Sequence, residues 1–199
     1  MQLLGTPTSP YTRKVRILLK AVGRAHRFID TRTNPGAALL AEAAPLGKIP
    51  VLLIGDGPGD GAIPDSSLIT TWLWTTEGDA LRAAGLALDP LDWADRSLQI
   101  VVEGALDAAI NHRYLRLDGF SDAGYIAKQR ERVERSLAWL DQRRMVYGRP
   151  LGAAALSLGC ALDWIAFRDV VDLARWPTLA AFRDAWQSSG LGAGSEPHE

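Results

Sequence analysis

The spacing of apolar residues divides the chain into a first part that contains strands and a second part that is helical throughout. Residues 2–4 form a short, mostly apolar run that ends at Gly5, which predicts a strand. An amphipathic helix should follow from Pro10 to Gly23, because apolar residues recur there at i, i+3, i+4 and i+7: Val15, Leu18, Leu19 and Val22. Residues 28–29 predict a second strand, and the link between the strands is long enough for a parallel crossover. The chain therefore begins as an α/β unit.

This unit continues to about residue 77. Four elements are expected next: a short or irregular helix at 34–44, a buried strand at 49–54, a hairpin loop at 55–61 and a short strand at 62–63. Pro64 belongs at the edge of the sheet, because proline has no backbone donor for a ladder. Asp65 or Ser66 then caps a helix whose inward face is Leu68, Ile69, Trp72 and Leu73.

The ordered pattern is lost between residues 78 and 90, and no later segment favours a strand. We therefore expect a two-domain α+β protein with a first domain at 1–77, a linker at 78–88 and an all-helical domain at 89–199. The second domain should contain four helices: one from Pro90 to about Leu117, one capped by Ser121, a central and wholly apolar one at 156–167, and one after Pro177. Residues 190–199 predict a loose tail.

Composition removes several classes of partner. The chain has 22 Lys and Arg residues against 23 Asp and Glu residues, so no general field attracts nucleic acid or an anionic membrane. The apolar run at 151–162 is shorter than the roughly 20 residues of a membrane-spanning helix, and the first residues lack the pattern of an export signal. The single cysteine, Cys160, and the three histidines form no metal-ligand pattern, and Cys160 should be a packed core thiol. We expect a cytoplasmic protein without a metal.

The stretch around Ser9 carries the candidate chemistry. Serine followed by proline is a strong helix start, since serine caps free backbone donors and proline has none to waste. The positive end of the helix at Pro10 would therefore stabilise an anion close to the Ser9 hydroxyl.

Three further motifs make the chain resemble the cytosolic glutathione transferases. The sequence from Thr8 to Arg16 is similar to that family's first loop and helix, and the sequence from Pro45 to Leu52 to its segment before the third strand. Asp65 and Ser66 stand where the family has an acidic residue and a serine, and residues 158–162 are similar to its core helix. The resemblance is greatest to bacterial members with serine in the first loop. It implies a thioredoxin-like first domain, an all-helical second domain and a homodimer.

The resemblance also implies roles in binding glutathione as cosubstrate. Ser9 would donate to the glutathione thiolate, Ile49 would pair its backbone with the cysteinyl peptide before a cis Pro50, and Lys48 would pair with the glycyl carboxylate. Asp65 would take the γ-glutamyl amino group and Ser66 the γ-glutamyl carboxylate. A small hydrophobic electrophile would bind beside Tyr11, Arg13, Asn111 and Tyr114.

Each motif also has a purely structural interpretation. Ser9 and Asp65 are ordinary helix caps when taken alone, an Ile-Pro bond is usually trans, and Arg13, Lys14 and Arg16 favour a solvated helix face. Trp72, Trp74, Trp93, Trp139 and Trp164 favour core positions. Gly152 and Ala155 depart from the resemblance, because the family's core helix usually opens with Ser or Thr and has Asp three residues later; losing that cap costs about 1 kcal/mol.

Three functions remain open on this basis. The first is conjugation of glutathione to the electrophile, and the second is a module that binds glutathione or a partner protein with little turnover. The third, disulfide exchange, needs a cysteine at the start of the first helix, where this chain has Ser9.

Overall fold

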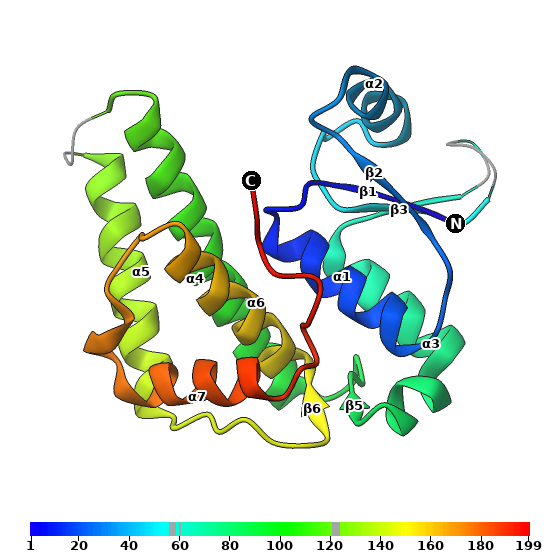
Figure 1. Cartoon of the computed structure of the whole chain (residues 1–199). Helices are drawn as coiled ribbons and strands as arrows, with labels where there is room; N and C mark the ends of the chain where they lie inside the picture. The colour runs from blue at the N-terminus through cyan, green and yellow to red at the C-terminus, as the bar shows by residue number, and fades with distance from the viewer. Residues whose placement is uncertain (56–58, 60, 121–123) are drawn as a thin grey trace. The chain divides into compact units, whose positions relative to one another are not determined.

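The computed structural model describes residues 1–55, 59, 61–120 and 124–199. Its contacts divide the chain into two units (Figure 1). The sheet unit comprises Met1–Pro90, Arg149–Leu151 and Gly192–Glu199, and the helical unit comprises Leu91–Gly148 and Gly152–Leu191.

The sheet unit is built on four strands in the order β2-β1-β3-β4. The strands are β1 (Gln2–Gly5), β2 (Arg27–Asp30), β3 (Val51–Leu53) and β4 (Ala62–Pro64). Strand β1 is parallel to β2 and antiparallel to β3, and β3 is antiparallel to β4. Helix α1 (Pro10–Ala21) joins β1 to β2, so the expected parallel crossover is confirmed.

Apolar side chains alternate between the two faces of this sheet. Leu4, Val51 and Leu53 are fully buried in a cluster with residues of α2 (Asn34–Ala43), among them Leu39 and Leu40. Helix α2 has ten residues and a Thr33 cap, so it is more regular than the sequence indicated. Helices α1 and α3 (Ser66–Ala83) pack against each other below the sheet in Figure 1.

The hairpin between β3 and β4 is confirmed, but both flanking elements differ in length from the prediction. Strand β3 is shorter than 49–54, and part of the expected loop at 55–61 lies outside the described residues. The Ile54 amide donates to the Gly61 carbonyl at 3.0 Å, and β4 with Pro64 forms the sheet edge. Helix α3 continues through a non-helical residue at Glu77 to Ala83, into the stretch expected to be a linker.

The helical unit contains α4 (Trp93–Leu117), α5 (Tyr125–Gln142), α6 (Ala153–Phe167), the 3₁₀ helix η2 (Leu173–Arg175) and α7 (Pro177–Ser188). Helix α4 packs on α5 and α6, and α7 also packs on α5 and α6. A small two-stranded sheet of β5 (Leu86–Ala87) and β6 (Leu151–Gly152) was not predicted. Strand β5 and Leu151 of β6 belong to the sheet unit.

Several boundaries and burials in this unit correct the sequence analysis. Helix α4 begins at Trp93 with Asp92 as its cap, two turn residues after Pro90, and Trp93 is exposed rather than in the core. Ser121 lies outside the described residues, and α5 begins after Gly124. In the sheet unit, Leu68 is likewise 52% exposed and does not belong to the inward face of α3.

Helix α6 is the buried centre of the helical unit, as its apolar sequence indicated. Cys160 is buried in it. A Cβ added at Gly159 would lie 2.3 Å from the Trp186 ring, so glycine is the residue that lets the indole of α7 reach the α6 backbone. The Asp163 carboxylate, 4% exposed, accepts hydrogen bonds from three α7 side chains: Arg183, Trp186 and Gln187.

The missing cap of α6 is supplied by a residue far away in sequence. Asp95 of α4 accepts from the Ala153 amide at 2.7 Å and from the Ala154 amide at 3.2 Å. A Cβ at Gly152 would lie 2.4 Å from the Asp95 carboxylate, which explains why glycine stands where a capping side chain was expected. The Asp95 carboxylate of α4 therefore offsets the loss of capping stability that we expected at Gly152 and Ala155.

Helix α7 has the same arrangement. Its N-cap residue, Trp176, makes no side-chain capping bond. Asp141 of α5 instead accepts from the Thr178 amide at 2.8 Å and from the Leu179 amide at 3.1 Å. Two helices of this unit thus begin on carboxylates that other helices provide.

We predict that Asp95→Ala lowers the free energy of unfolding by about 1 to 3 kcal/mol, because two half-buried amides lose their acceptor. Burial raises the pKa of the Asp95 carboxyl, although the two amide bonds oppose the shift. A raised pKa means that the folded state binds this proton more tightly, so the contribution of Asp95 to stability is lost as pH rises through that pKa. The stability of Asp95→Asn, which keeps an acceptor without the charge, should therefore increase relative to the parent as pH rises above the ordinary range of an aspartate, about pH 4.

Urea unfolding at several pH values measures both effects. Glu131→Ala is the control, since Glu131 is exposed and makes an i,i+4 ion pair with Arg135, which is worth only a few tenths of a kcal/mol. Equal stability of Asp95→Ala and the control would contradict the capping role.

Candidate functional site

The C-terminal ends of β1, β2 and β4 and the N-terminal end of β3 lie side by side at one end of the sheet. The loops that carry the expected site residues are attached there, and we call this end of the strands the site edge. Read across the sheet, the register pairs Gly5 with Asp30, Leu4 with Val51, and Val51 with Pro64. Neighbouring strands lie about 4.8 Å apart. Pro50, which precedes Val51, and Asp65, which follows Pro64, therefore stand in the same row as Gly5.

Ser9 forms the N-terminal cap of α1 in the loop that leaves β1. Its Oγ accepts from the Thr12 amide at 3.1 Å, and its own amide donates to the Thr6 carbonyl at 3.2 Å. Pro10 follows at the first helical position, so the predicted helix start is confirmed. The Thr12 bond uses a lone pair of the hydroxyl and leaves the hydroxyl proton for another acceptor. Ser9 thus combines a donor with the positive end of a helix.

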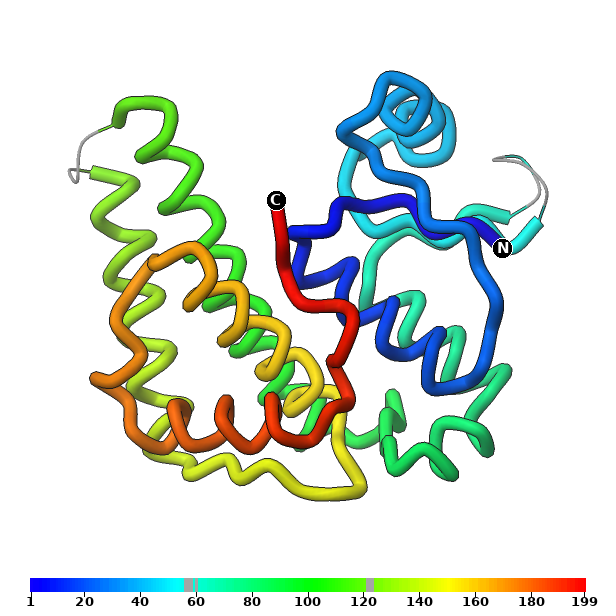
Figure 2. Tube along the Cα trace, in the orientation of Figure 1, coloured from blue at the N-terminus to red at the C-terminus, as the bar shows by residue number. Residues whose placement is uncertain are grey.

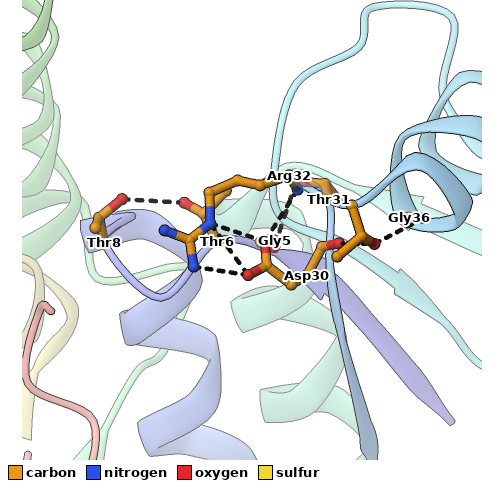
Figure 3. A network of polar contacts seen from close by, with 8 residues as sticks. Gly5, Thr6, Thr8, Asp30, Thr31, Arg32 and Gly36 are labelled. Atoms are coloured by element: carbon orange, nitrogen blue, oxygen red, sulfur yellow. Dashed lines mark hydrogen bonds and ion pairs between the residues drawn. The ribbon is translucent and has the colours of Figure 1, made fainter. Parts of the chain in front are cut away.

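The loop before Ser9 is held by the turn that follows β2. Thr31 bonds the Gly5 carbonyl twice, from its amide at 3.0 Å and from its hydroxyl at 3.3 Å (Figure 3). The hydroxyl oxygens of Thr6 and Thr8 lie 3.3 Å apart. The position of Ser9 therefore depends on backbone contacts with β2 as well as on the helix that it caps.

Arg32, which sequence reasoning missed, places a cation at the same edge. Its Nη2 lies 2.7 Å from Asp30 Oδ2 and its Nε lies 3.1 Å from both carboxylate oxygens (Figure 3). Hydrogen bonds from the Arg32 side chain lower the pKa of the Asp30 carboxyl, and the same contact raises the pKa of Arg32. No periodicity could have identified this pair, because it joins the last residue of β2 to a residue of the turn that follows.

The Ile49–Pro50 peptide bond is cis, as the resemblance implied. Pro50 is buried and Ile49 half-buried at the start of β3, while Lys48 is exposed beside a Gly47 with positive φ. The backbone of Ile49 and the ammonium group of Lys48 thus occur in one short segment at this edge.

Asp65 adopts an unusual backbone conformation where β4 ends. Its φ of 72° is in a region that non-glycine residues rarely occupy, and such residues concentrate at functional sites. Its Oδ1 caps α3 by accepting from the Ser67 amide at 2.7 Å and the Leu68 amide at 3.2 Å. Ser66 is 2% exposed at the first position of α3. The acid and the serine therefore lie together at a helix start.

The interpretation of Arg13 and Lys14 as a solvated helix face is wrong. Arg13 is 3% exposed and Lys14 is 1% exposed. Arg13 lies one turn after Ser9 on the same side of α1, and long helical side chains lean toward the helix N-terminus. The structure thus adds a buried cation near the start of α1.

The C-terminal residues explain part of this burial, and the predicted loose tail is also wrong. Residues 192–199 run along α1 (Figure 2) and belong to the sheet unit. Three cations of α1 bond this segment: Arg13 Nε to Ser195 Oγ at 3.3 Å, Arg16 Nη2 to the Gly194 carbonyl at 3.2 Å, and Lys20 Nζ to the Ala193 carbonyl at 3.0 Å. The Glu199 charge also acts on Arg32, so the segment extends from α1 toward the site edge.

The remaining expected residues lie in both units. Tyr11, like Arg13, is on α1, and Asn111 and Tyr114 are exposed on α4. Within the described part of the chain, no three His, Cys, Asp or Glu side chains are grouped to hold a metal ion. Among the described helices, none has both the length and the apolar character needed to cross a membrane.

Comparisons with known proteins give the geometry a context. Residues 3–80 match the family model of the glutathione S-transferase N-terminal domain. The uncharacterised GST-like protein YibF of Escherichia coli is 29% identical over 177 residues, which cover 85% of this chain and 84% of YibF.

Two solved structures are similar over nearly the whole chain. A glutathione S-transferase from Methylobacterium radiotolerans, in complex with glutathione sulfonate, has a TM-score of 0.81 at 27% identity and covers 100% of this chain and 95% of its own. A glutathione S-transferase from Methylobacillus flagellatus with glutathione bound has a TM-score of 0.83 at 26% identity and covers 99% of both chains. The expected fold, a thioredoxin-like domain followed by a helical domain, is confirmed.

The docked C-terminal segment leads to a stability prediction. Ser195→Ala should lower the free energy of unfolding by about 1 to 2 kcal/mol, because the buried Arg13 guanidinium loses one acceptor and the Gly192 carbonyl loses its 2.6 Å donor. A chain ending at Leu191 should have a still lower free energy of unfolding than Ser195→Ala. Urea unfolding provides the measurement, with Ser97→Ala as the control because Ser97 is exposed on α4. A truncated chain as stable as the parent would show that the segment contributes nothing.

Proposed function

We propose that the chain is a bacterial glutathione S-transferase-type protein, since residues 3–80 match the N-terminal domain of that family, and that it conjugates the glutathione thiolate to a small hydrophobic electrophile. The observation that carries this proposal is the Ser9 hydroxyl. It accepts from the Thr12 amide, which directs its proton away from α1 at the positive end of the helix.

The free energy needed for thiol activation is within reach of this arrangement. A thiol with a pKa of about 8.5 must fall by roughly 1.5 units to be mostly ionised at neutral pH, which is about 2 kcal/mol. A hydrogen bond to a charged acceptor contributes about 1.5 to 3 kcal/mol, and a helix N-terminus about 0.3 to 2 kcal/mol. Ser9 and α1 therefore suffice without a general base.

The reaction follows from this role. The glutathione thiol loses its proton to solvent, and the thiolate sulfur forms a bond to the electrophilic carbon while the leaving group departs with its bonding electrons. Ser9 donates to the sulfur before bond formation and forms no covalent bond itself.

The other motifs at the sheet edge suit the rest of the tripeptide. Ile49 offers backbone groups beside the cis Pro50, and exposed Lys48 offers an ammonium group for the glycyl carboxylate. Asp65 keeps Oδ2 for the γ-glutamyl amino group while Oδ1 caps α3, and Ser66 supplies a hydroxyl and an amide for the carboxylate. Tyr11, Arg13, Asn111 and Tyr114 are the proposed contacts of the electrophile.

A binding module with little turnover is the second candidate. It would use the same residues at the sheet edge but would not need to lower the thiol pKa. Disulfide exchange is disfavoured, because Ser9 stands where that chemistry needs a cysteine. We also propose that the protein acts in the cytoplasm.

We predict that Ser9→Ala impairs thiol activation and that Ser66→Ala impairs glutathione binding. Ser9→Ala should raise the thiol pKa of bound glutathione by about one unit and lower turnover of an aryl halide roughly 10- to 100-fold, while affinity changes little. Ser66→Ala should weaken glutathione binding by about 1 to 3 kcal/mol and leave the thiol pKa unchanged. Thiolate absorbance against pH and calorimetry measure the two quantities.

Two further variants separate capping from activation. Ser9→Asn keeps a capping oxygen and should fold like the parent, so its turnover would match the parent if Ser9 were only a cap. Ser9→Cys should gain disulfide reductase activity, because the helix end would stabilise its thiolate. If the thiol pKa of bound glutathione is lowered equally in the parent and in Ser9→Ala, a group other than Ser9 activates the thiol. If the thiol pKa is unperturbed in both, the binding module is favoured.

We propose a homodimer, and we predict that it uses α4. Trp93 and Ile100 lie two turns apart on this helix and are 74% and 66% exposed, so α4 presents apolar side chains on a second face. Sedimentation at micromolar concentration should give twice the 21.6 kDa chain mass. Ile100→Glu should shift the protein toward the monomer, whereas Val146→Glu, at an exposed apolar residue outside α4, should not. A monomeric parent would refute the proposal.

A further inference from the structure

The helical unit contains a cavity of about 470 Å³ that none of the proposed transferase residues lines. It is bounded by the last turns of α4, the second turn of α5 and the end of α6, through His112, Arg113, Arg116, Leu117, Arg130, Arg168, Asp169 and Val170. Small-molecule sites commonly have volumes of about 300 to 1,000 Å³. The cavity is therefore large enough for a small organic anion.

The side chains that line the cavity are mostly positively charged. Among the described residues, eight line the cavity; four of these are arginines and one is an acid, although the whole chain has nearly equal numbers of basic and acidic residues. The ends of α4 and α6 add only about −0.5 elementary charge each. Asp169 and these two helix ends therefore balance only part of the charge of the four guanidinium groups. Glu134 also pairs with Arg130 and with Arg175.

Some of these side chains are held in place by the protein. Arg113 Nη1 donates to the Arg168 carbonyl at 3.4 Å, and the Arg168 guanidinium lies over the Phe167 ring, 4.6 Å from its centroid. Arg130 Nε lies 3.4 Å from Glu134 Oε1. His112, 8% exposed, forms an inner wall. A guanidinium has five N–H donors in a planar fork, so one bond to the protein fixes its position and keeps donors for a carboxylate or phosphate.

We propose that this cavity is a binding site for a small anion with two oxyanion groups, either a dicarboxylate or a diphosphate. Arg113 and Arg116 of α4 and Arg130 of α5 reach it from two helices, so a ligand with two acidic groups bridges them. A described lining with four guanidinium groups and one carboxylate matches such an anion better than a neutral or cationic ligand. The proposal does not depend on glutathione transfer, since no lining residue belongs to the sheet unit.

Calorimetry on the full chain at constant ionic strength tests this site with two probes, inorganic pyrophosphate and succinate. Arg113→Gln/Arg116→Gln should weaken binding at least tenfold. The matched control is Arg132→Gln/Arg135→Gln, which removes two exposed charges of α5 outside the cavity. The control should bind like the parent, and thermal unfolding checks that both variants are folded.

A third variant gives a result that loss of folding cannot imitate. Asp169→Asn removes the one lining carboxylate, and asparagine tolerates the positive φ of 49° at this position. It should tighten binding about two- to fivefold. Heat from pyrophosphate alone identifies the site as one for phosphates, and heat from succinate alone as one for carboxylates. Absence of binding by either probe at millimolar concentration, or equal weakening in both double variants, overturns the proposal.

Discussion

The structure depends on how each helix satisfies the backbone donors of its first turn, which no partner inside the helix can accept from. In the sheet unit the acceptor is local: Ser9 caps α1, Thr33 caps α2 and Asp65 caps α3. In the helical unit α6 and α7 lack a side-chain cap of their own and begin on Asp95 and Asp141. The need to cap first-turn amides is thus met within each helix of the sheet unit, whereas in the helical unit it links α6 to α4 and α7 to α5.

The proposed site uses helix starts at which the capping residue can form further hydrogen bonds after it has capped the helix. At α1 the cap uses only a lone pair of the Ser9 hydroxyl, and no carboxylate lies in the first turn to neutralise the helix dipole. At α3 the cap is itself a carboxylate, so in the binding mode that we propose Asp65 contacts an ammonium group and Ser66 contacts an anion. In this proposal the two helix starts bind different parts of one ligand: a thiolate at α1, and a group with both charges at α3.

Sequence reasoning succeeded where the signal was local. Ser9-Pro10, the hairpin after β3 and the apolar run of α6 each depend on residues adjacent in sequence, and the structure has all three. It failed where burial is decided by distant residues: Lys14 is buried and Trp93 is exposed against their usual preference. The caps by Asp95 and Asp141, the Arg32 pair and the docking of Ser195 are also tertiary contacts, and periodicity carries no information about them.

The C-terminal segment makes the sheet unit discontinuous in sequence. Residues 192–199 bond a helix that begins at Pro10, so a loop of more than 180 residues closes when Arg13 meets Ser195. The entropic cost of closing a loop grows only with the logarithm of its length, and most of this loop is already ordered when the helical unit is folded. The large sequence separation therefore adds little to the cost of this contact. The burial of Arg13, one turn from Ser9, thus depends on the docked residues 192–199 as well as on α1.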